Sequence, residues 1–377
     1  MFDLIIRNGT VIDPAVGPLG KADIAIRRGR IVHVGSLHGA EAADVIDASG
    51  ALVTPGLVDF HLHAAPLAEI GVSAETACFT SGVTTAVDCG SAGCATYMGH
   101  RGFLLSGKLT VKCFLHVCSA GLVTGRYHEN PDPACYDREK IIRCFEDFRG
   151  ELVGLKIRQG AEIVGALGLE PLKAAIRLAE EIGVPVMVHG SNPPCPMEEI
   201  LRLLRPGDIL THAYQDRGGS ILDESGRVSS EARLARRRGV IFDVANANIH
   251  FSYQVARAAI ADGFLPDTIS TDLTTRSLYK RPRVFNLLHV MAKYRNMGLS
   301  LADVLERCTS RPAELLGMRG VIGSLSEGAR ADIAILKEID RPAEFGDCHG
   351  EIMTANRILK ALATIKDGEL IYRDIEF

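Results

Sequence analysis

The chain changes between two patterns of hydrophobic and polar residues. Residues 1–53 consist of short runs in which apolar and polar side chains alternate, separated by turn residues such as Asn8-Gly9 and the link Arg27 to Arg30. A period of two is typical of strands with one buried face, and a short link that contains glycine joins two such runs into a hairpin. The pattern therefore predicts a small β-layer over residues 1–53.

At Thr54 the pattern changes to near-continuous apolar runs of strand length that alternate with helical patterns. The predicted strands cover residues 55–63, 82–89, 111–119, 152–157, 184–189, 208–212, 240–245 and 268–272. Apolar strands that alternate with helices indicate a parallel sheet covered by helices. Eight such strands over about 260 residues predict an α/β fold of the (β/α)8 type, a TIM barrel, which we assign to residues 54–318.

The last part of the chain, residues 319–377, returns to alternating strand patterns. Two of its runs, 358–365 and 369–373, flank Lys366-Asp367-Gly368, and an Asp-Gly pair between two strands is a hairpin signal. The two ends of the chain thus look alike and complementary. We expect them to form one small β-sandwich domain beside the barrel.

Composition and charge exclude several classes of protein. The chain is 47% hydrophobic and 23% charged, as in ordinary globular proteins, and its net charge of -4 argues against a nucleic-acid partner. No apolar run approaches 18 residues, so we expect no membrane-spanning segment. The 10 cysteines are scattered without a Cys-x-x-Cys pair, and the start of the chain has no signal-peptide pattern. We therefore expect free thiols and a cytoplasmic location.

Residues that bind metals gather at the predicted ends of the barrel strands. These are His61 and His63 on the first strand, Lys156 on the fourth, His189 on the fifth, His212 on the sixth and Asp272 on the eighth. Residues two apart on a strand project from the same face, so both histidines of the first strand point the same way. The carboxyl ends of barrel strands meet at one rim, where active sites are built. Imidazoles and a carboxylate at that rim are the ligands of a catalytic divalent-metal site.

The motifs around these residues resemble the amidohydrolase superfamily. The similar stretches are PGLVDFHLH, GLKIR, VMVHG, ILTHAY and ISTDL. The resemblance covers essentially the whole chain, and it is to two-metal members such as dihydroorotase, hydantoinase and isoaspartyl dipeptidase. It implies a metal-dependent hydrolase with two divalent ions, for which zinc is the first candidate, although such ligands also suit Mn, Fe or Co.

The resemblance also implies a role for each candidate ligand. The more buried ion is held by His61, His63 and Asp272, and the exposed ion by His189 and His212. A carbamate on Lys156 bridges the two ions, and burial favours it because it lowers the pKa of the lysine towards the neutral amine that carbamate formation requires. The nucleophile is a bridging hydroxide, and Asp272 is the general base that passes its proton to the leaving group.

Residues that contact the substrate are less clearly marked. Dihydroorotases typically carry His-x-His-x-Arg at the first strand, and here Ala65 ends that stretch without an arginine. Arg158 on the fourth strand is a candidate to bind a carboxylate bidentately, with a rim salt bridge as the alternative. In the loop after the third strand, Tyr127 is placed to polarise a carbonyl, as a tyrosine from this loop does in hydantoinases. Asn246 and His250 follow the seventh strand and are candidates for the pocket, with a turn position as the alternative.

The stretches GLKIR, HGSNPP and HAYQD look most like a branch of dihydroorotase-like deacetylases, whose members hydrolyse acetyl esters of α-hydroxy acids such as (R)-mandelate. We therefore expect an enzyme that removes an acetyl group from a small carboxylated substrate. Because barrel enzymes of this type often associate, we also expect a homo-oligomer. The alternatives are a cyclic-amide hydrolase of the dihydroorotase or hydantoinase type, an isoaspartyl-type dipeptidase and a non-catalytic scaffold. A scaffold that has lost ligands is disfavoured, because every expected ligand position is filled.

Overall fold

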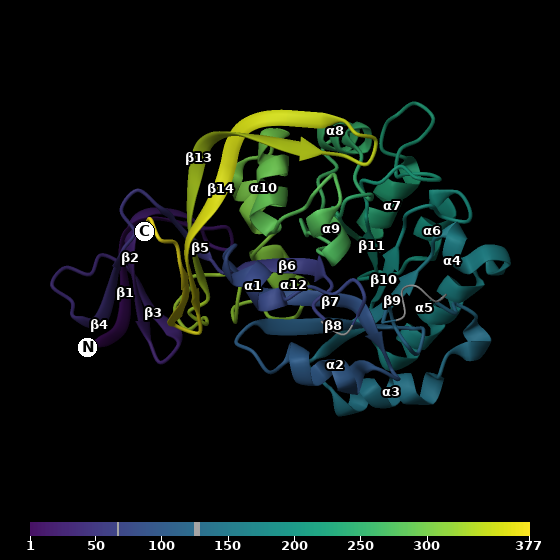
Figure 1. Ribbon diagram of the computed structural model, residues 1–377, viewed down its shortest axis with the longest axis horizontal. Coiled ribbons are helices and arrows are strands. Elements are labelled where there is room, and N and C mark those ends of the chain that lie inside the picture. Colours follow the sequence, from purple (N-terminus) through teal and green to yellow (C-terminus); the bar gives the residue numbers. More distant parts are fainter. Residues whose placement is uncertain (66–67, 124–128) are drawn as a thin grey trace.

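A computed structural model of the chain describes residues 1–65, 68–123 and 129–377 (Figure 1). At its centre is a curled parallel sheet whose strands lie side by side in chain order. These strands are β6 (Leu57–Leu62), β7 (Val83–Gly93), β8 (Thr110–His116), β9 (Leu152–Arg158), β10 (Val186–His189), β11 (Ile209–Thr211) and β12 (Ile241–Asp243). The predicted TIM barrel is therefore confirmed.

The eighth predicted strand, residues 268–272, is less regular than the sequence pattern indicated. Single parallel bridges connect this segment to the two edge strands of the sheet, Asp243 to Thr268 at β12 and Leu62 to Leu273 at β6. Side chains take the place of a full ladder, since the buried carboxylate of Asp59 accepts hydrogen bonds from the N–H and the hydroxyl of Thr271, at 3.0 and 2.7 Å. The segment still closes the barrel, and the amide of Asp272 donates to the carbonyl of His61 at 2.7 Å.

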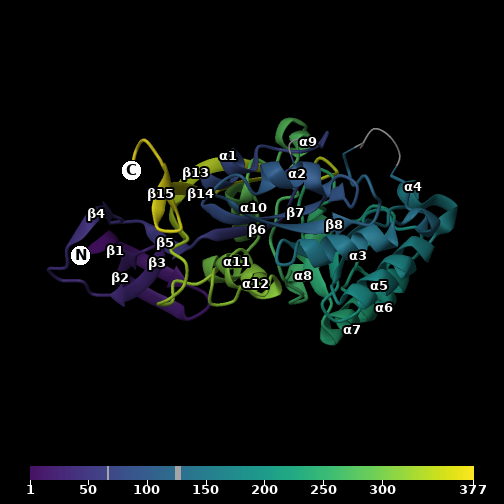
Figure 2. The ribbon, with the colours of Figure 1, turned by 90° about the horizontal axis from the view of Figure 1, so that it is seen from below.

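Helices cover the outside of the barrel (Figure 2). They are α1 (Ala74–Phe79), α2 (Tyr97–Leu104), α3 (Arg138–Asp147), α4 (Ala161–Val164), α5 (Glu170–Ile182), α6 (Met197–Leu203), α7 (Ser230–Arg238), α8 (Tyr253–Ala261), α9 (Thr275–Tyr279), α10 (Leu287–Asn296), α11 (Leu301–Glu306) and α12 (Ser310–Leu315), with 3-10 turns at Pro133–Cys135 and Gly165–Leu167. In α5 the apolar face of Leu172, Ala175 and Ala179 is buried, and Gly183 ends the helix with φ 79°. None of the helices in the described part of the chain has the length and apolar character that a membrane crossing requires.

Both ends of the chain form a second sheet beside the barrel. Its strands are β1 (Phe2–Asp13), β2 (Gly17–Arg27), β3 (Arg30–Gly35), β4 (Ala42–Asp47) and β5 (Leu52–Pro55) from one end, and β13 (Ile333–Gly346), β14 (Ile352–Lys366) and β15 (Glu369–Arg373) from the other. β5 joins the two halves, because it pairs with β1 in parallel and with β13 antiparallel. The small β domain built from both termini is confirmed, and the boundaries at residues 53/54 and 318/319 stay a proposal.

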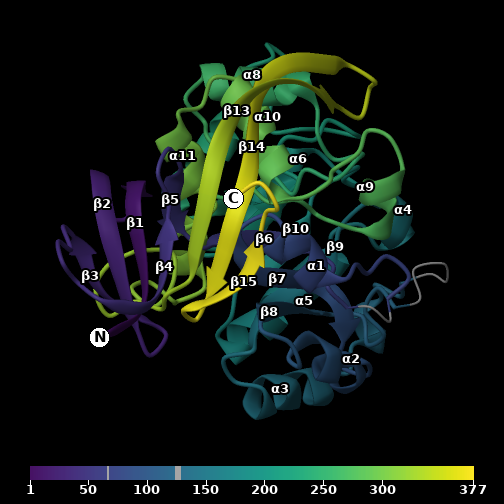
Figure 3. The same ribbon diagram turned by 60° about the vertical axis from the view of Figure 1, so that its left-hand side comes forward.

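The strands β13 and β14 extend well beyond the small domain. They curve over the barrel as a long hairpin that packs on α10 and ends near α8 (Figure 3). The tip of the hairpin is hydrogen-bonded to the barrel: the hydroxyl of Tyr253 donates to the carbonyl of Phe345 at 2.8 Å, and Lys293 Nζ donates to the carbonyl of Gly346 at 2.8 Å. The small domain is therefore anchored to the side of the barrel that carries the strand-end loops.

Candidate metal centre

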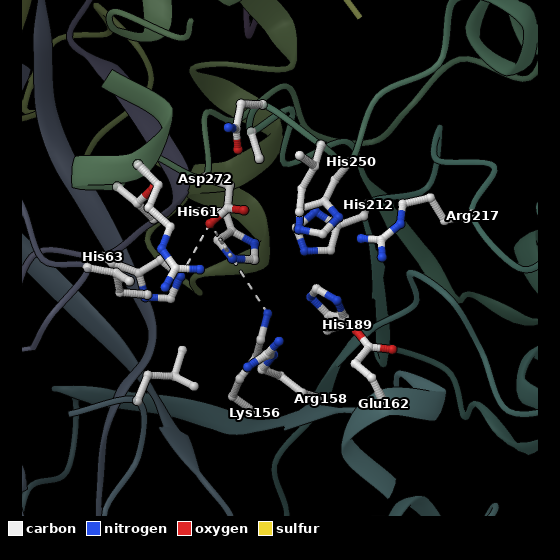
Figure 4. A pocket seen from close by; sticks show the side chains of 17 residues that line it. His61, His63, Lys156, Arg158, Glu162, His189, His212, Arg217, His250 and Asp272 are labelled. Atoms are coloured by element: carbon white, nitrogen blue, oxygen red, sulfur yellow. Dashed lines mark hydrogen bonds and ion pairs between the residues drawn. The ribbon is translucent and has the colours of Figure 1, made fainter. Parts of the chain in front are cut away.

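A cavity of about 160 Å³ opens at the carboxyl ends of the barrel strands (Figure 4). Its lining includes all the predicted metal ligands, which are His61, His63, Lys156, His189, His212 and Asp272. Each of these residues is buried, and none is more than 7% exposed. The fold thus brings together residues that lie more than 200 positions apart in the sequence.

One side of the cavity is organised around the carboxylate of Asp272. Its Oδ1 lies 3.2 Å from His63 Nε2 and 3.7 Å from His61 Nε2. Lys156 Nζ lies 3.5 Å from the same His61 nitrogen. Two imidazoles, an amine and a carboxylate therefore converge on one small volume, as the ligand set predicted for the more buried ion requires.

On four histidines of the cavity the Nδ1 nitrogen is held by the protein. The Nδ1 contacts, at 2.8 to 3.3 Å, are Thr211 and Asp243 for His61, Ser91 for His63, Ala245 for His212 and Ser191 for His250. The partner of His212 is a backbone carbonyl, which only accepts, so Nδ1 carries the proton and Nε2 presents its lone pair to the cavity. Histidines that bind metals are oriented in this way by the groups behind them.

Burial sets the protonation of the imidazoles. It lowers the pKa values of His61, His189 and His212 well below the ordinary value, and it lowers that of His250 to about 4. The positive charge of Arg217 acts in the same direction on the pKa of His250. These four imidazoles are therefore neutral at pH 7, the form that binds metal ions.

The protonation states of Lys156 and Asp272 also suit the binding of a metal ion. Burial lowers the pKa of Lys156 and so favours the neutral amine. Burial alone would raise the pKa of Asp272, but its contacts with His63 and His61 lower it overall. Gly90, with φ 87°, allows β7 to approach the lysine, since a Cβ there would lie 2.6 Å from Lys156 Cγ. The donor set therefore fits divalent ions in its charge as well as its geometry.

The other side of the cavity contains one histidine more than the predicted ligand set. The ring centroid of His250 lies 4.1 Å from that of His212 and 4.9 Å from that of His189. Donor atoms of these three residues all lie within 4.8 Å of one another. His250 was predicted from the sequence as a substrate contact, and its position suits either that role or a third ligand.

The backbone is unusual at two of the predicted ligands. His212 and Asp272 adopt positive φ angles of 64° and 49°, a region that residues other than glycine rarely occupy and that costs about 1–3 kcal/mol. His212 directly follows the last residue of β11, and Asp272 directly precedes Leu273, which is bridged to Leu62 of β6. The turn of the backbone at these points directs their side chains into the cavity, and such strain is common at functional sites.

The other predicted substrate residues have different surroundings. Arg158 lines the cavity, but its Nη1 donates to Glu129 Oε2 at 2.5 Å, so the salt bridge considered as its alternative role exists. Asn246 is 2% exposed and its amide donates to the carbonyl of Ala247. It does not belong to the lining of the cavity in the described part of the chain. Tyr127 lies outside the described residues.

Several residues of the site were not predicted from the sequence. Asp243, which ends β12, is fully buried and accepts hydrogen bonds from the hydroxyls of Thr211, Thr268 and Ser270 at 2.6 to 2.8 Å. A carboxylate at the end of a predicted barrel strand was the signal that could have revealed it. The other residues of the site that were not predicted come from loops or the start of a short helix, where no periodic pattern marks them. They are Glu129, Glu162, Arg217 and Arg276.

Comparison with known proteins shows similarity over nearly the whole chain. The model of the amidohydrolase family matches residues 52–371. A deacetylase of Agrobacterium fabrum is 33% identical over 347 residues, which cover 91% of this chain and 84% of that protein. Among solved structures, a dihydroorotase has a TM-score of 0.89 and 31% identity, covering 98% of this chain and 99% of that one. An adenine deaminase has a TM-score of 0.91 and 27% identity, covering 99% and 100%.

Proposed function

The chain belongs to the amidohydrolase family of hydrolytic metalloenzymes, and we propose that it removes an acetyl group from a small carboxylated substrate such as O-acetyl-(R)-mandelate. The observation that carries this proposal is the cavity, in which neutral imidazoles and a carboxylate form the floor and arginines line the mouth. A floor of this composition suits hydrolysis. A cationic mouth suits a substrate that carries a carboxylate.

The ligands divide between two divalent ions, for which we propose zinc. His61, His63 and Asp272 would hold one ion, His189 and His212 would hold the other, and Lys156, as a carbamate, would supply a further anionic ligand. When bound, such ions polarise the acyl carbonyl and lower the pKa of water to near 7. The carbamate is supported by the burial of Lys156, which is 2% exposed and whose pKa is lowered by that burial.

Two side chains of the floor are placed for proton transfer and substrate contact. Asp272 Oδ1 faces His61 and His63, at the point where the donor groups converge. It is therefore the carboxylate that takes the proton of the attacking water and passes it to the leaving oxygen. His250 Nδ1 is hydrogen-bonded to the hydroxyl of Ser191 at 2.8 Å, which leaves Nε2 to contact the substrate.

The mouth of the cavity supports a small anionic substrate. Arg158, Arg217 and Arg276 line it together with a single carboxylate among the non-ligand residues described, that of Glu162. A volume of about 160 Å³ suits a small molecule. The position at which dihydroorotases carry an arginine is Ala65, which is fully buried, and this favours a deacetylase over that activity. The predicted homo-oligomer and cytoplasmic location are part of the same proposal.

A panel of substrates tests the function. Metal-replete enzyme is assayed for acetate release from O-acetyl-(R)-mandelate, its (S) enantiomer and N-acetyl-D-amino acids, and for turnover of dihydroorotate, hydantoins and isoaspartyl dipeptides. We expect acetate release that prefers one enantiomer of the ester. Turnover of a cyclic amide or a dipeptide without acetate release would keep the metal site and replace the deacetylase by the corresponding alternative.

A further inference from the structure

We propose that Arg217, in the loop after β11, binds the carboxylate of the substrate, and that Arg158 does not. The inference rests on the proposed function, because it names the residue that recognises the substrate in the same cavity. Arg158, Arg217 and Arg276 all line this cavity. They differ in what their guanidinium groups already contact, and that difference decides which of them is available to an anion.

The charge of Arg158 is already neutralised by a buried carboxylate. Arg158 Nη1 lies 2.5 Å from Glu129 Oε2, and the side chain of Glu129 is 5% exposed. The second oxygen of Glu129 lies 2.9 Å from His116 Nε2. His116 Nδ1 accepts from the amide of Cys118 at 3.0 Å, so its proton is on Nε2, facing Glu129. To bind at Arg158, a substrate carboxylate would have to share its guanidinium group with a carboxylate that is held from both sides.

Arg276 is the second cation, and it lies at the outer edge of the cavity. Its side chain is 59% exposed and its Nη2 lies 3.9 Å from Glu69 Oε1. Arg217 is exposed as well, so solvent and salt screen both charges. What separates the two arginines is the carboxylate of Glu69, which already lies beside the guanidinium group of Arg276. Arg276 therefore contributes to the overall positive field of the mouth.

Arg217 has its charge available. Among the described residues, which include every Asp and Glu of the chain, no carboxylate oxygen lies within 4.0 Å of its guanidinium group. The adjacent Asp216 turns away from it, since Asp216 Oδ2 lies 2.7 Å from His349 Nε2 at the tip of the β13–β14 hairpin. Figure 4 shows the Arg217 side chain on the same side of the cavity as His212 and His250.

The backbone of Arg217 is fixed on both sides, which gives the side chain a rigid base. Its N–H donates to Gln215 Oε1 at 2.7 Å, and its carbonyl accepts from the amide of Asn192 at 2.8 Å. Gly218 follows with φ 69°, and a Cβ there would lie 2.5 Å from Asn192 Oδ1, so this close packing requires glycine. A fixed backbone restricts where the guanidinium group can reach, which reduces the freedom that the side chain loses on binding.

The position also fits the chemistry of an α-acyloxy acid. Only a few bonds separate the carboxylate of such a molecule from its acyl carbonyl. A carboxylate at Arg217 therefore leaves the acyl group beside His189, His212 and His250, which line the same cavity. Binding at one end of the molecule then orients the bond to be cleaved at the other.

The test compares a charged substrate with a neutral one of the same shape. Acetate release is measured for O-acetyl-(R)-mandelate and for its carboxamide, with the wild type, Arg217→Met, Arg217→Lys and Arg276→Met. We expect Arg217→Met to raise KM for the acid by about 30- to 100-fold, as removal of a charged contact does, and to change KM for the carboxamide less than about threefold. Arg217→Lys should recover part of the loss, since an ammonium contacts a carboxylate at one point.

The controls separate this inference from the proposed function. Arg276→Met removes the same charge from the same mouth, and an equal rise in KM would show a general field and overturn the role of Arg217. If the wild type releases no acetate, the proposed function fails, and calorimetry with (R)-mandelate, lactate and N-acetylglycine decides the inference. Binding that is lost in Arg217→Met supports it. Equal binding by both proteins, or none of the three anions bound by the wild type, overturns it.

Discussion

The floor of the cavity comes mostly from strand ends, whereas its wall comes mostly from loops and the starts of short helices. The exceptions are His250 of the floor, which lies in a loop, and Arg158 of the wall, which ends β9. We use "floor" for His61, His63, Lys156, His189, His212, His250 and Asp272, and "wall" for Arg158, Glu162, Arg217, Ile249 and Arg276. Floor residues are at most 9% exposed and are held from behind by further buried polar groups. On the wall, Ile249 is 44% exposed and the side chains of Arg158 and Arg276 are 28% and 59% exposed.

This difference indicates a division of labour. The floor is fixed by the barrel and supplies the chemistry that members of the family share, while the wall can change with the loops and sets the substrate. Changes in the floor should therefore affect metal content and all activity together. Changes in the wall should affect KM for particular substrates and leave the metal content unchanged.

The largest effect is expected when the floor loses Lys156. Lys156→Ala removes the group proposed to contact both ions, so activity should fall by more than about 10³-fold, beyond the 10- to 100-fold typical of residues that only orient ligands. The bound metal per chain should fall with it. Activity assays and elemental analysis of protein purified without chelators measure both effects.

A second buried lysine provides the control for this variant. Lys293 is 2% exposed, and its Nζ donates to the carbonyl of Gly346, away from the cavity. Lys293→Met should lower stability but keep the metal. Full activity in Lys156→Ala would refute the carbamate, and equal metal loss in Lys293→Met would mean that any buried lysine is needed for the fold.

A smaller effect, on the free energy of unfolding, is expected when the floor residue His250 takes up a proton in the metal-free protein. His250 has a pKa of about 4 when folded, because it is buried, against 6.5 when exposed. As pH falls below about 6.5, the unfolded chain takes up this proton first, so the free energy of unfolding falls. From pH 7 to pH 5 this histidine alone should cost about 2 kcal/mol.

Urea unfolding at the two pH values measures this change, with His250→Asn as the comparison. Asp59, whose pKa burial raises to about 7, acts in the opposite direction, since its contribution to stability increases as pH falls from 7 towards 4. The informative quantity is therefore the difference between the two proteins, because Asp59 contributes equally to both. Identical pH slopes for the wild type and His250→Asn would contradict the neutral, buried state of this imidazole.

The same division explains what the sequence could predict. The meeting of strand-end residues such as His61 and His212 in one cavity was predictable, because hydrophobic runs locate the strands and barrel topology brings their ends together. Asp243 also ended a predicted strand and could have been identified. Glu129 and Arg217 could not, since their roles depend on which side chains they meet, and Glu129 meets His116 and Arg158 across the fold.

Two features of the fold could also not be predicted from the hydrophobic pattern. The eighth strand was predicted as a regular one, but the hydrogen bonds of Asp59 and Asp243 to residues 268–271 replace most of its ladder. The pattern also gave no measure of how far β13 and β14 extend past the small domain. Their length depends on packing against α10 and on contacts at the hairpin tip, which exist only once the barrel has formed.

The smallest effect on activity is expected from Glu129→Gln, which alters the wall behind Arg158. The neutral amide keeps the shape of the side chain but removes the charge that pairs with Arg158 and faces His116. Because the pKa of Glu129 is lowered by these partners against the effect of burial, the carboxylate is the native form at pH 7. Its loss should lower the free energy of unfolding by about 1–3 kcal/mol, the cost of weakening a buried charged contact.

Activity and metal content in this variant sharpen the comparison between floor and wall. With Arg217 still in place, kcat/KM for O-acetyl-(R)-mandelate should change less than about tenfold, which corresponds to about 1.4 kcal/mol. The metal per chain should equal that of the wild type, because Glu129 contacts His116 and Arg158 and none of the floor residues. Glu162→Gln, at an exposed carboxylate of the wall, is the control and should keep both stability and metal. If Glu129→Gln loses metal, the wall supports the floor through β9, which carries Lys156 and Arg158 two residues apart, and the two regions are one unit.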